Sequence, residues 1–191
     1  MPAELIIFTA DCRVSGTVPL ADDRLSDMLN SVPRIVVRGA ELMDVLADAP
    51  TEHADVTIAT ASIVAVLVGG RRGVETRRRR TNAHRVKIGI VRYVVSGSLH
   101  IPAGRASNLE SRDPAVVLAG RDVLVPLTGA TITYDRGPDS ITESFDTILV
   151  NRSLATWIES DDGSIVNDGD LLSERPKVYH AAMAKDFTGA T

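Results

Sequence analysis

The stretch CRVSGTVPLADDRLSDMLN, residues 12–30, is nearly repeated as YVVSGSLHIPAGRASNLES at residues 93–111. At a shift of 81 residues, the two copies align without a gap from about residue 7 to residue 49. Glycines and prolines match as well as aliphatic residues, as in Gly16 with Gly97, Pro33 with Pro114 and Gly39 with Gly120. Two unrelated β-rich stretches would share mainly aliphatic positions, so this wider agreement predicts an internal duplication.

The second copy is expected to contain an insertion in TYDRGPDSITES, residues 133–144, because this stretch is rich in turn-forming residues. Beyond it the match resumes at a shift of 91, with DVTIATASIVAVL (residues 55–67) opposite DTILVNRSLATWI (residues 146–158). The duplication then covers most of the first 160 residues.

Each copy has the pattern of a small β domain. Residues 4–20, ELIIFTADCRVSGTVPL, predict two strands or a sharply bent hairpin, and Gly16 inside this pattern indicates a bulge or a tight bend. Residues 24–30, RLSDMLN, predict one helical turn with Ser26 as its N-cap. Three further strands are expected in residues 34–42, 55–62 and 63–68.

These elements predict an all-β protein made of two tandem, duplicated, five-stranded bent barrels, each with one short helical turn. Neither barrel has a generous core, so the two are expected to pack through a pseudo-twofold interface. The expected divisions are a first barrel at residues 1–70, an arginine-rich linker at 71–85, a second barrel at 86–160 and a C-terminal tail at 161–191.

Composition is that of a folded globular protein, with 44% hydrophobic and 24% charged residues. No apolar run approaches the ~20 residues that a membrane-spanning helix needs, and the N-terminus lacks the features of a secretion signal. Cys12 is the only cysteine, so no internal disulfide can form, which fits a reducing compartment. A cytoplasmic protein without membrane contact is expected.

The linker concentrates positive charge. Residues 71–85 carry a net +6, which leaves −10 on the rest of a chain whose total is −4. Such a strip could neutralise phosphates, although no aromatic residue is interleaved for base stacking. It could equally be a solvated linker, dock on the acidic remainder of the protein or bind an acidic partner. The arginines are Arg71, Arg72, Arg77, Arg78, Arg79, Arg80 and Arg85.

Two family resemblances follow from these motifs. The RLSDMLN stretch after a V-x-G-x-V strand, together with Val150-Asn151-Arg152 later in the chain, resembles a bacterial domain family marked by R-L-S-D-x-L-N. No activity comes with that resemblance. More distantly, the spacing of Gly16 and Asp22 is similar to that of Sm-like barrels, which assemble into rings and often bind RNA. Ser26 replaces the asparagine of the Sm motif and Ala103 its aspartate in the second copy, so the RNA pocket is not reproduced.

The residues that the two copies share have two interpretations. The arginine of the motif could contact an anion or a partner. In the structural interpretation, which we favour, the glycine bends the strand, the serine caps the helical turn and the aspartate favours its N-terminal end. These residues are Gly16, Arg24, Ser26 and Asp27 in the first copy and Gly97, Arg105, Ser107 and Asn108 in the second.

Signals for catalysis are weak. The four histidines lie far apart without metal-ligand spacing, and no nucleophile elbow, phosphate loop or dinucleotide motif occurs. We therefore expect a non-catalytic binding or assembly module without cofactor or metal. It would use strand edges and the basic linker to contact protein partners or other copies of itself. The alternative is sequence-nonspecific nucleic-acid binding through the linker. An enzyme would require a pocket between the barrels, lined by Arg24, Arg105 or His100.

Overall fold

The computed structural model describes residues 2–20, 24–44, 49–69, 81–102, 122–136, 138–160 and 165–167. The N-terminal half comprises β1 (Pro2–Thr9), β2 (Cys12–Pro19), α1 (Leu25–Ser31), β3 (Arg34–Asp44), β4 (Thr51–Ala59), the 3-10 turn η1 (Thr60–Ser62) and β5 (Ile63–Gly69). The C-terminal half comprises β6 (Thr81–Ile90), β7 (Tyr93–Pro102), β8 (Leu124–Arg136), β9 (Asp139–Asn151), the 3-10 turn η4 (Arg152–Leu154) and β10 (Ala155–Ser160). A short strand, β11 (Ile165–Asn167), follows.

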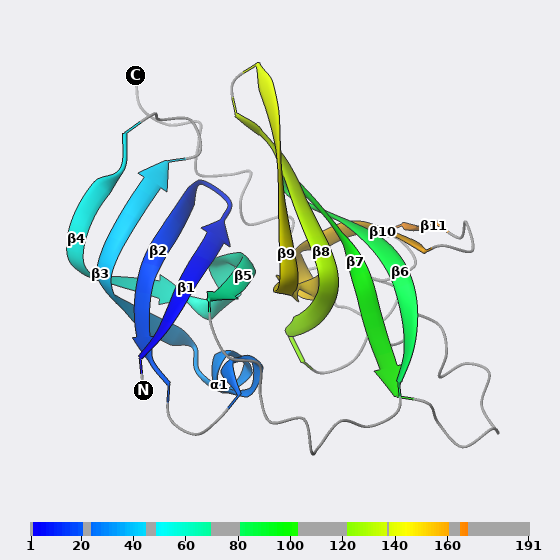
Figure 1. Cartoon of the computed structure of the whole chain (residues 1–191), viewed down its shortest axis with the longest axis horizontal. Helices are drawn as coiled ribbons and strands as arrows, with labels where there is room; N and C mark the ends of the chain where they lie inside the picture. Colours follow the sequence, from blue (N-terminus) through cyan, green and yellow to red (C-terminus); the bar gives the residue numbers. More distant parts are fainter. Residues whose placement is uncertain are drawn as a thin grey trace, which may run out of the picture.

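All of these strands belong to one antiparallel sheet (Figure 1). Its strand order is β11-β10-β6-β7-β8-β9-β5-β1-β2-β3-β4. The two halves therefore have the same internal order, with the fifth strand beside the first and the fourth strand at the far side. In both halves a 3-10 turn connects the fourth strand to the fifth.

Alternating side chains explain the strands. In β3, Ile35 and Val37 are buried while Arg34, Val36 and Arg38 are exposed, as expected for a strand with one face on a core. β1 and β2 form a hairpin with continuous pairing from Pro2 opposite Pro19 to Phe8 opposite Arg13.

A β-bulge lies at the predicted place in each half, but its extra residue belongs to the third strand, opposite the bent-strand glycine of the second. Ser15 pairs with Glu41 and Thr17 with Arg38, so Gly16 faces two residues of β3. The first of these, Gly39, has a φ of +53°, a conformation that glycine adopts without strain. The C-terminal half has the same bulge between Ser96 and Ser98, with Gly129 at +54°.

The halves are joined by backbone pairing between the fifth strand of one and the fourth strand of the other. Ala65, Val66 and Leu67 of β5 pair with Val150, Leu149 and Ile148 of β9. β5 is buried on both faces: Ile63 and Val66 belong to the core of the N-terminal half, whereas Val64, Ala65 and Leu67 belong to that of the C-terminal half. Each core thus includes side chains from both halves.

The all-β class is confirmed, but the sheet is open, and two separate closed barrels are not what the described strands form. One of the two strands that would close each half on itself, β5 or β9, instead pairs with the neighbouring half. The expected pseudo-twofold interface is also wrong, because a twofold would pair like strands, whereas β5 pairs with β9.

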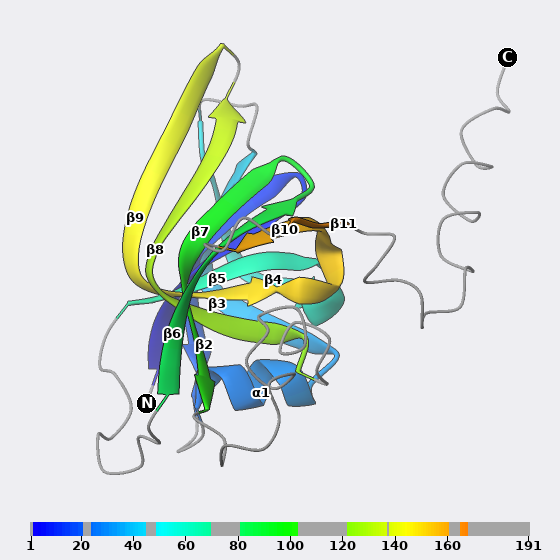
Figure 2. The same ribbon diagram turned by 90° about the vertical axis from the view of Figure 1, so that its right-hand side faces the viewer.

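Helix α1 lies below the strands, at the end of the molecule opposite the projecting β8–β9 hairpin (Figure 2). Leu25 and Leu29 are buried and Met28 packs on the same core. The helix begins at Leu25, with Arg24 in the N-cap position and without a side-chain capping bond. Ser26 lies inside the first turn and contacts Asp27 at 3.4 Å, so the prediction that Ser26 caps the helix is wrong. The acidic residue in the first turn is Asp27, as expected.

The strand registers also correct the sequence alignment of the two copies. The shift of 81 holds for the first two strands, which align Gly16 with Gly97. In the third strand Gly39 corresponds to Gly129 rather than Gly120, a shift of 90, because both glycines lie in the bulge. In the fourth and fifth strands the shift is 92, since Ile58 and Val150 occupy the same register. Much of the extra length therefore precedes β8 instead of following it.

Candidate functional site

The outer edge of β4 is the most exposed strand surface of the N-terminal half. β4 pairs with β3 from Thr51 opposite Leu42 to Ala59 opposite Arg34, and no other described strand pairs with it. Seven of its nine residues are exposed, and of the nine only Ile58 is buried. An edge strand presents unpaired N–H and C=O groups that can accept another strand. This edge is therefore the first candidate for a binding surface.

The opposite end of the sheet is covered differently. β10, the fifth strand of the C-terminal half, pairs with β6 on one side and with β11 on the other. The β10–β11 pairing comprises three residue pairs: Trp157 with Asn167, Ile158 with Val166 and Glu159 with Ile165. Three residues of backbone thus separate the edge of β10 from solvent.

The junction between the halves is fixed by a buried asparagine. Asn151, at the end of β9, is fully buried, and its Nδ2 donates to the carbonyl of Ile63 at 2.8 Å. Its Oδ1 accepts from the amide of Ser153 at 3.0 Å and from the hydroxyl of Ser153 at 2.5 Å. The amide therefore ties β9 to the start of β5 and shapes the turn η4 at the same time.

A second asparagine braces the junction from the helix side. Asn30 of α1 donates to the carbonyl of Leu124 at 3.2 Å and accepts from the Leu124 amide at 2.9 Å. Both backbone groups at the start of β8 are thus satisfied by one side chain of the other half. Arg152, 8% exposed, donates from Nε to the Asp122 carbonyl, and its own amide donates to the Val123 carbonyl at 3.0 Å.

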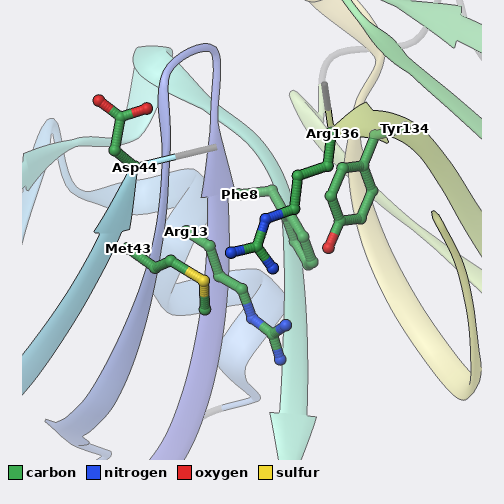
Figure 3. A pocket seen from close by; sticks show the side chains of 6 residues that line it. All are labelled: Phe8, Arg13, Met43, Asp44, Tyr134 and Arg136. Carbon is green, nitrogen blue, oxygen red and sulfur yellow. The ribbon is translucent and has the colours of Figure 1, made fainter. Parts of the chain in front are cut away.

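A small pocket opens at the same junction, where Arg136 reaches from the C-terminal half toward Arg13 (Figure 3). Arg13 forms an ion pair with Glu143 at 3.3 Å and lies over the Phe8 ring, 5.6 Å from its centroid. The ion pair crosses from one half to the other, and the two contacts together leave the guanidinium of Arg13 engaged rather than open to a ligand. The lining residues are Phe8, Arg13, Met43, Asp44, Tyr134 and Arg136.

Three aromatic rings pack against one another at this junction. Phe8 lies 5.7 Å from Tyr93 and 5.9 Å from Tyr134, and the two tyrosine rings are 5.6 Å apart. The Tyr93 hydroxyl donates to the carbonyl of Thr9 at 2.9 Å, and the Tyr134 hydroxyl donates to Glu143 at 2.9 Å. The two contacts of Phe8, with Tyr93 and with Tyr134, contribute packing across the halves.

Both tyrosines are held protonated. Burial raises the pKa of Tyr93 to about 12. Burial, followed by the hydrogen bond to Glu143, raises the pKa of Tyr134. At neutral pH each phenol is therefore a hydrogen-bond donor, and neither is activated as a base or nucleophile.

The described histidines and carboxylates do not form a metal centre. Among these residues no group of three or more His, Cys, Asp or Glu side chains is placed to hold an ion. His100 contacts the hydroxyl of Thr128 at 2.7 Å on an exposed strand face, and Cys12 packs against the core while contacting Thr9 at 3.2 Å. Among the residues that the structure describes, no helix is long and apolar enough to cross a membrane.

Most of the predicted anion-binding residues lie outside the described residues. These are Arg71, Arg72, Arg77, Arg78, Arg79 and Arg80, together with the motif residues Arg105, Ser107 and Asn108. Arg85, expected in the linker, instead lies exposed in β6, which begins at Thr81. His84 is in the same strand, so residues 81–85 are strand rather than linker.

The described motif residues have structural positions. Gly16 is required by close packing, because a β-carbon there would lie 2.6 Å from Val37 Cγ1 and 2.9 Å from the Arg38 carbonyl oxygen. Gly97 faces Leu127 and Ala130 at 3.0 and 3.1 Å in the same way. Of the motif arginines Arg24 and Arg105, only Arg24 lies among the described residues; it is exposed at the start of α1 and does not line the pocket between the halves.

Sequence reasoning did not assign roles to the residues that join the halves. Asn30 and Asn151 each belong to one of the sequence motifs, and the structure places each at a contact with the other half. A buried asparagine at the end of an apolar strand is the signal that could have identified Asn151, since such an amide needs partners.

Comparisons with known proteins give no relative for this chain: no family model, no curated protein and no solved structure matches it.

Proposed function

We propose that the protein is a non-catalytic binding or assembly module that receives an extended segment of a partner along the edge of β4. The observation that carries the proposal is the exposure of this nine-residue strand, whose outer side is paired with no described segment. Strand addition to such an edge supplies affinity through backbone hydrogen bonds and specificity through alternate side chains. The proposal includes the interpretation of the two halves as copies of one five-stranded unit, which their equal strand order supports.

The side chains of β4 favour a controlled contact over unrestricted aggregation. Glu52, His53 and Asp55 are exposed along the strand, and charged residues on an edge discourage unspecific strand pairing. Towards its end, Val56, Thr57 and Ile58 form a short segment of high β propensity. A partner strand is therefore expected to pair with the second part of β4.

The test is a selection of displayed extended peptides on the immobilised full chain, followed by titration of the selected peptides. Two proline variants, Val56→Pro and Thr57→Pro, form a matched pair. Successive N–H groups of a strand alternate between the two sides, so one of these variants removes an outward donor and the other disturbs pairing with β3. Circular dichroism identifies the variant that keeps its fold.

We expect selected peptides to bind the wild type and to lose at least tenfold in affinity on the folded proline variant. Amide exchange in residues 51–59 should slow when a peptide is bound, because outward N–H groups become hydrogen-bonded. Peptides that bind the wild type and the folded proline variant equally, or protection elsewhere in the sheet, would contradict the proposal.

Nucleic-acid binding through residues 71–85 is the alternative, favoured by the net charge of +6 within fifteen residues. Fluorescence anisotropy with random oligonucleotides across a salt series tests it, with Arg77, Arg78, Arg79 and Arg80 changed to alanine as the control. Binding that weakens steeply with salt and is lost in the control would support this alternative. No binding at low salt would exclude it.

A further inference from the structure

The strand registers reveal that β11 occupies a position that belongs to a fourth strand. Between the halves, β9 pairs with β5 at Ala65, Val66 and Leu67. The strand registers align these three residues with Trp157, Ile158 and Glu159 of β10, because Phe8 opposite Ala65 corresponds to Gly89 opposite Trp157. These are the same three residues of β10 that pair with β11.

The correspondence extends to the covering strand. On β5, the partners are Val150, Leu149 and Ile148 of β9. On β10, the residues in the same places and the same antiparallel direction are Asn167, Val166 and Ile165. β11 therefore covers the edge of β10 at the register in which β9 covers the edge of β5.

Of the two fourth strands, one pairs with no fifth strand among the described residues. β4 is the counterpart of β9, and the registers within each half align Ile58, Thr57 and Val56 with Val150, Leu149 and Ile148. The described sheet consequently ends in β4 on one side and, beneath β11, in β10 on the other. These two edges are complementary in the same way as the edges that already pair at the junction.

We propose that β10 is a docking site for β4 of a second copy of this chain, and that β11 covers this site in the single chain. The proposal rests on the proposed function, because it names the partner strand for the β4 edge. It predicts the register between copies: Ile58 opposite Trp157, Thr57 opposite Ile158 and Val56 opposite Glu159. The contact is heterologous, so it adds copies head to tail instead of forming a closed twofold dimer.

The residues at the two kinds of junction indicate that the contact between copies is the weaker one. The position of Asn151, whose Nδ2 binds the Ile63 carbonyl, is taken by Ala59 at the end of β4. Leu149, which is buried in the core of the N-terminal half, corresponds to the exposed Thr57. The internal junction is thus reinforced by a buried amide and a buried leucine that β4 does not supply. Pairing between copies then depends on displacing β11.

The experiment mixes two full-length proteins, one variant and the wild type. The first carries Val166→Pro, which removes one backbone donor from β11, together with the folded β4 proline variant described above. The second has an intact β11 and an intact β4, that is, the wild-type chain. Only a β4–β10 contact can join the open β10 of the first variant to the β4 of the second. Sedimentation velocity measures association of each protein alone and of the mixture.

We expect each protein alone to be monomeric at micromolar concentration and the equimolar mixture to form a 1:1 complex. A chain that carries Val166→Pro alone should form longer species, with a dissociation constant at least tenfold lower than that of the wild type. A mixture that stays monomeric overturns the proposal. Wild-type chains that associate as tightly as the Val166→Pro chain would also overturn it, because β11 would then not cover the docking site.

Register-specific cross-linking provides the second measurement. In a Cys12→Ser background, Val56→Cys on one chain and Glu159→Cys on the other should form an intermolecular disulfide, since directly opposite residues of paired strands lie within bridging distance. Thr57→Cys with Glu159→Cys is the control, because these positions are one residue out of register. Equal cross-linking of both pairs would refute the predicted register. If Val166→Pro disturbs the fold, the double variant Ile165→Gly, Val166→Gly replaces it.

This design separates the inference from the proposed function. Peptides that bind the β4 edge, combined with copies that do not associate, would retain the binding module and reject self-assembly. If no peptide binds the β4 edge but copies still associate through β10, self-assembly would be retained and peptide binding at β4 rejected.

Discussion

The strongest test of the fold is to remove the amide of Asn151. Replacing it with alanine eliminates the bonds to the Ile63 carbonyl, the Ser153 amide and the Ser153 hydroxyl. The side chain is fully buried, so water cannot replace the amide without a rearrangement. Two backbone groups lose their partners, at about 1–3 kcal/mol each, and we expect a loss of about 3 kcal/mol in the free energy of unfolding.

Urea unfolding measures this loss with two probes. Circular dichroism reports both halves, whereas fluorescence of Trp157, the only tryptophan, reports the C-terminal half. The shared core and sheet predict that both probes give one coincident transition in the wild type. The Asn151→Ala variant should unfold at lower urea with an unchanged slope.

Ser153→Ala is the control, since it removes only the hydroxyl bond and should cost less than about 1 kcal/mol. A loss below 1 kcal/mol for Asn151→Ala would refute the view that this amide fastens the halves. Separate transitions for the two probes in the wild type would refute the shared core.

Three further predictions follow from the same contacts. Gly16→Ala should destabilise by about 2 kcal/mol and Gly97→Ala by about 1 kcal/mol in urea unfolding, because the new β-carbon would lie 2.6 Å and 3.0 Å from its nearest neighbours, respectively; equal losses would contradict this ranking. The free energy of unfolding should fall by about 1.4 kcal/mol per pH unit between pH 10 and pH 12. The reason is that folding raises the pKa of Tyr93 from 10.0 to about 12, so the unfolded chain releases this proton first. A Tyr93→Phe variant should lack this component in unfolding curves measured across that range. A double-mutant cycle on Arg13 and Glu143 should give a coupling of about 0.5–1 kcal/mol that decreases in 1 M salt, because both side chains are about one quarter exposed; a coupling independent of salt would argue against an ion pair.

The sequence predicted the local elements well where side-chain patterns are unambiguous. The alternation in residues 34–42 and the apolar run in residues 63–68 both correspond to strands, and Gly16 lies at a bulge. The helix was also located, although it starts at Leu25 and leaves Ser26 inside the first turn. These features depend on neighbours in the chain, so local reasoning can reach them.

The pairing of the halves could not be predicted from the same patterns. An apolar strand such as β5 has the same sequence pattern whether it closes its own barrel or pairs with a neighbouring unit. The alignment error has a similar origin. Gly39 aligns with Gly120 in the sequence, but the structural counterpart of Gly39 is Gly129, which lies in the bulge at positive φ. Backbone register, which decides between such matches, depends on contacts between distant segments.

The two fourth strands differ where their surroundings differ. β9 carries Leu149 and Asn151 at the junction, where one side chain enters a core and the other satisfies a buried carbonyl. At the corresponding places, β4 carries Thr57 and Ala59, which are exposed. When each unit pairs its fourth strand with the fifth strand of the preceding unit, one edge of each kind stays unpaired, whatever the number of units. In this chain one of those edges has a polar strand and the other a three-residue cover, so both ends of the sheet are protected without being closed.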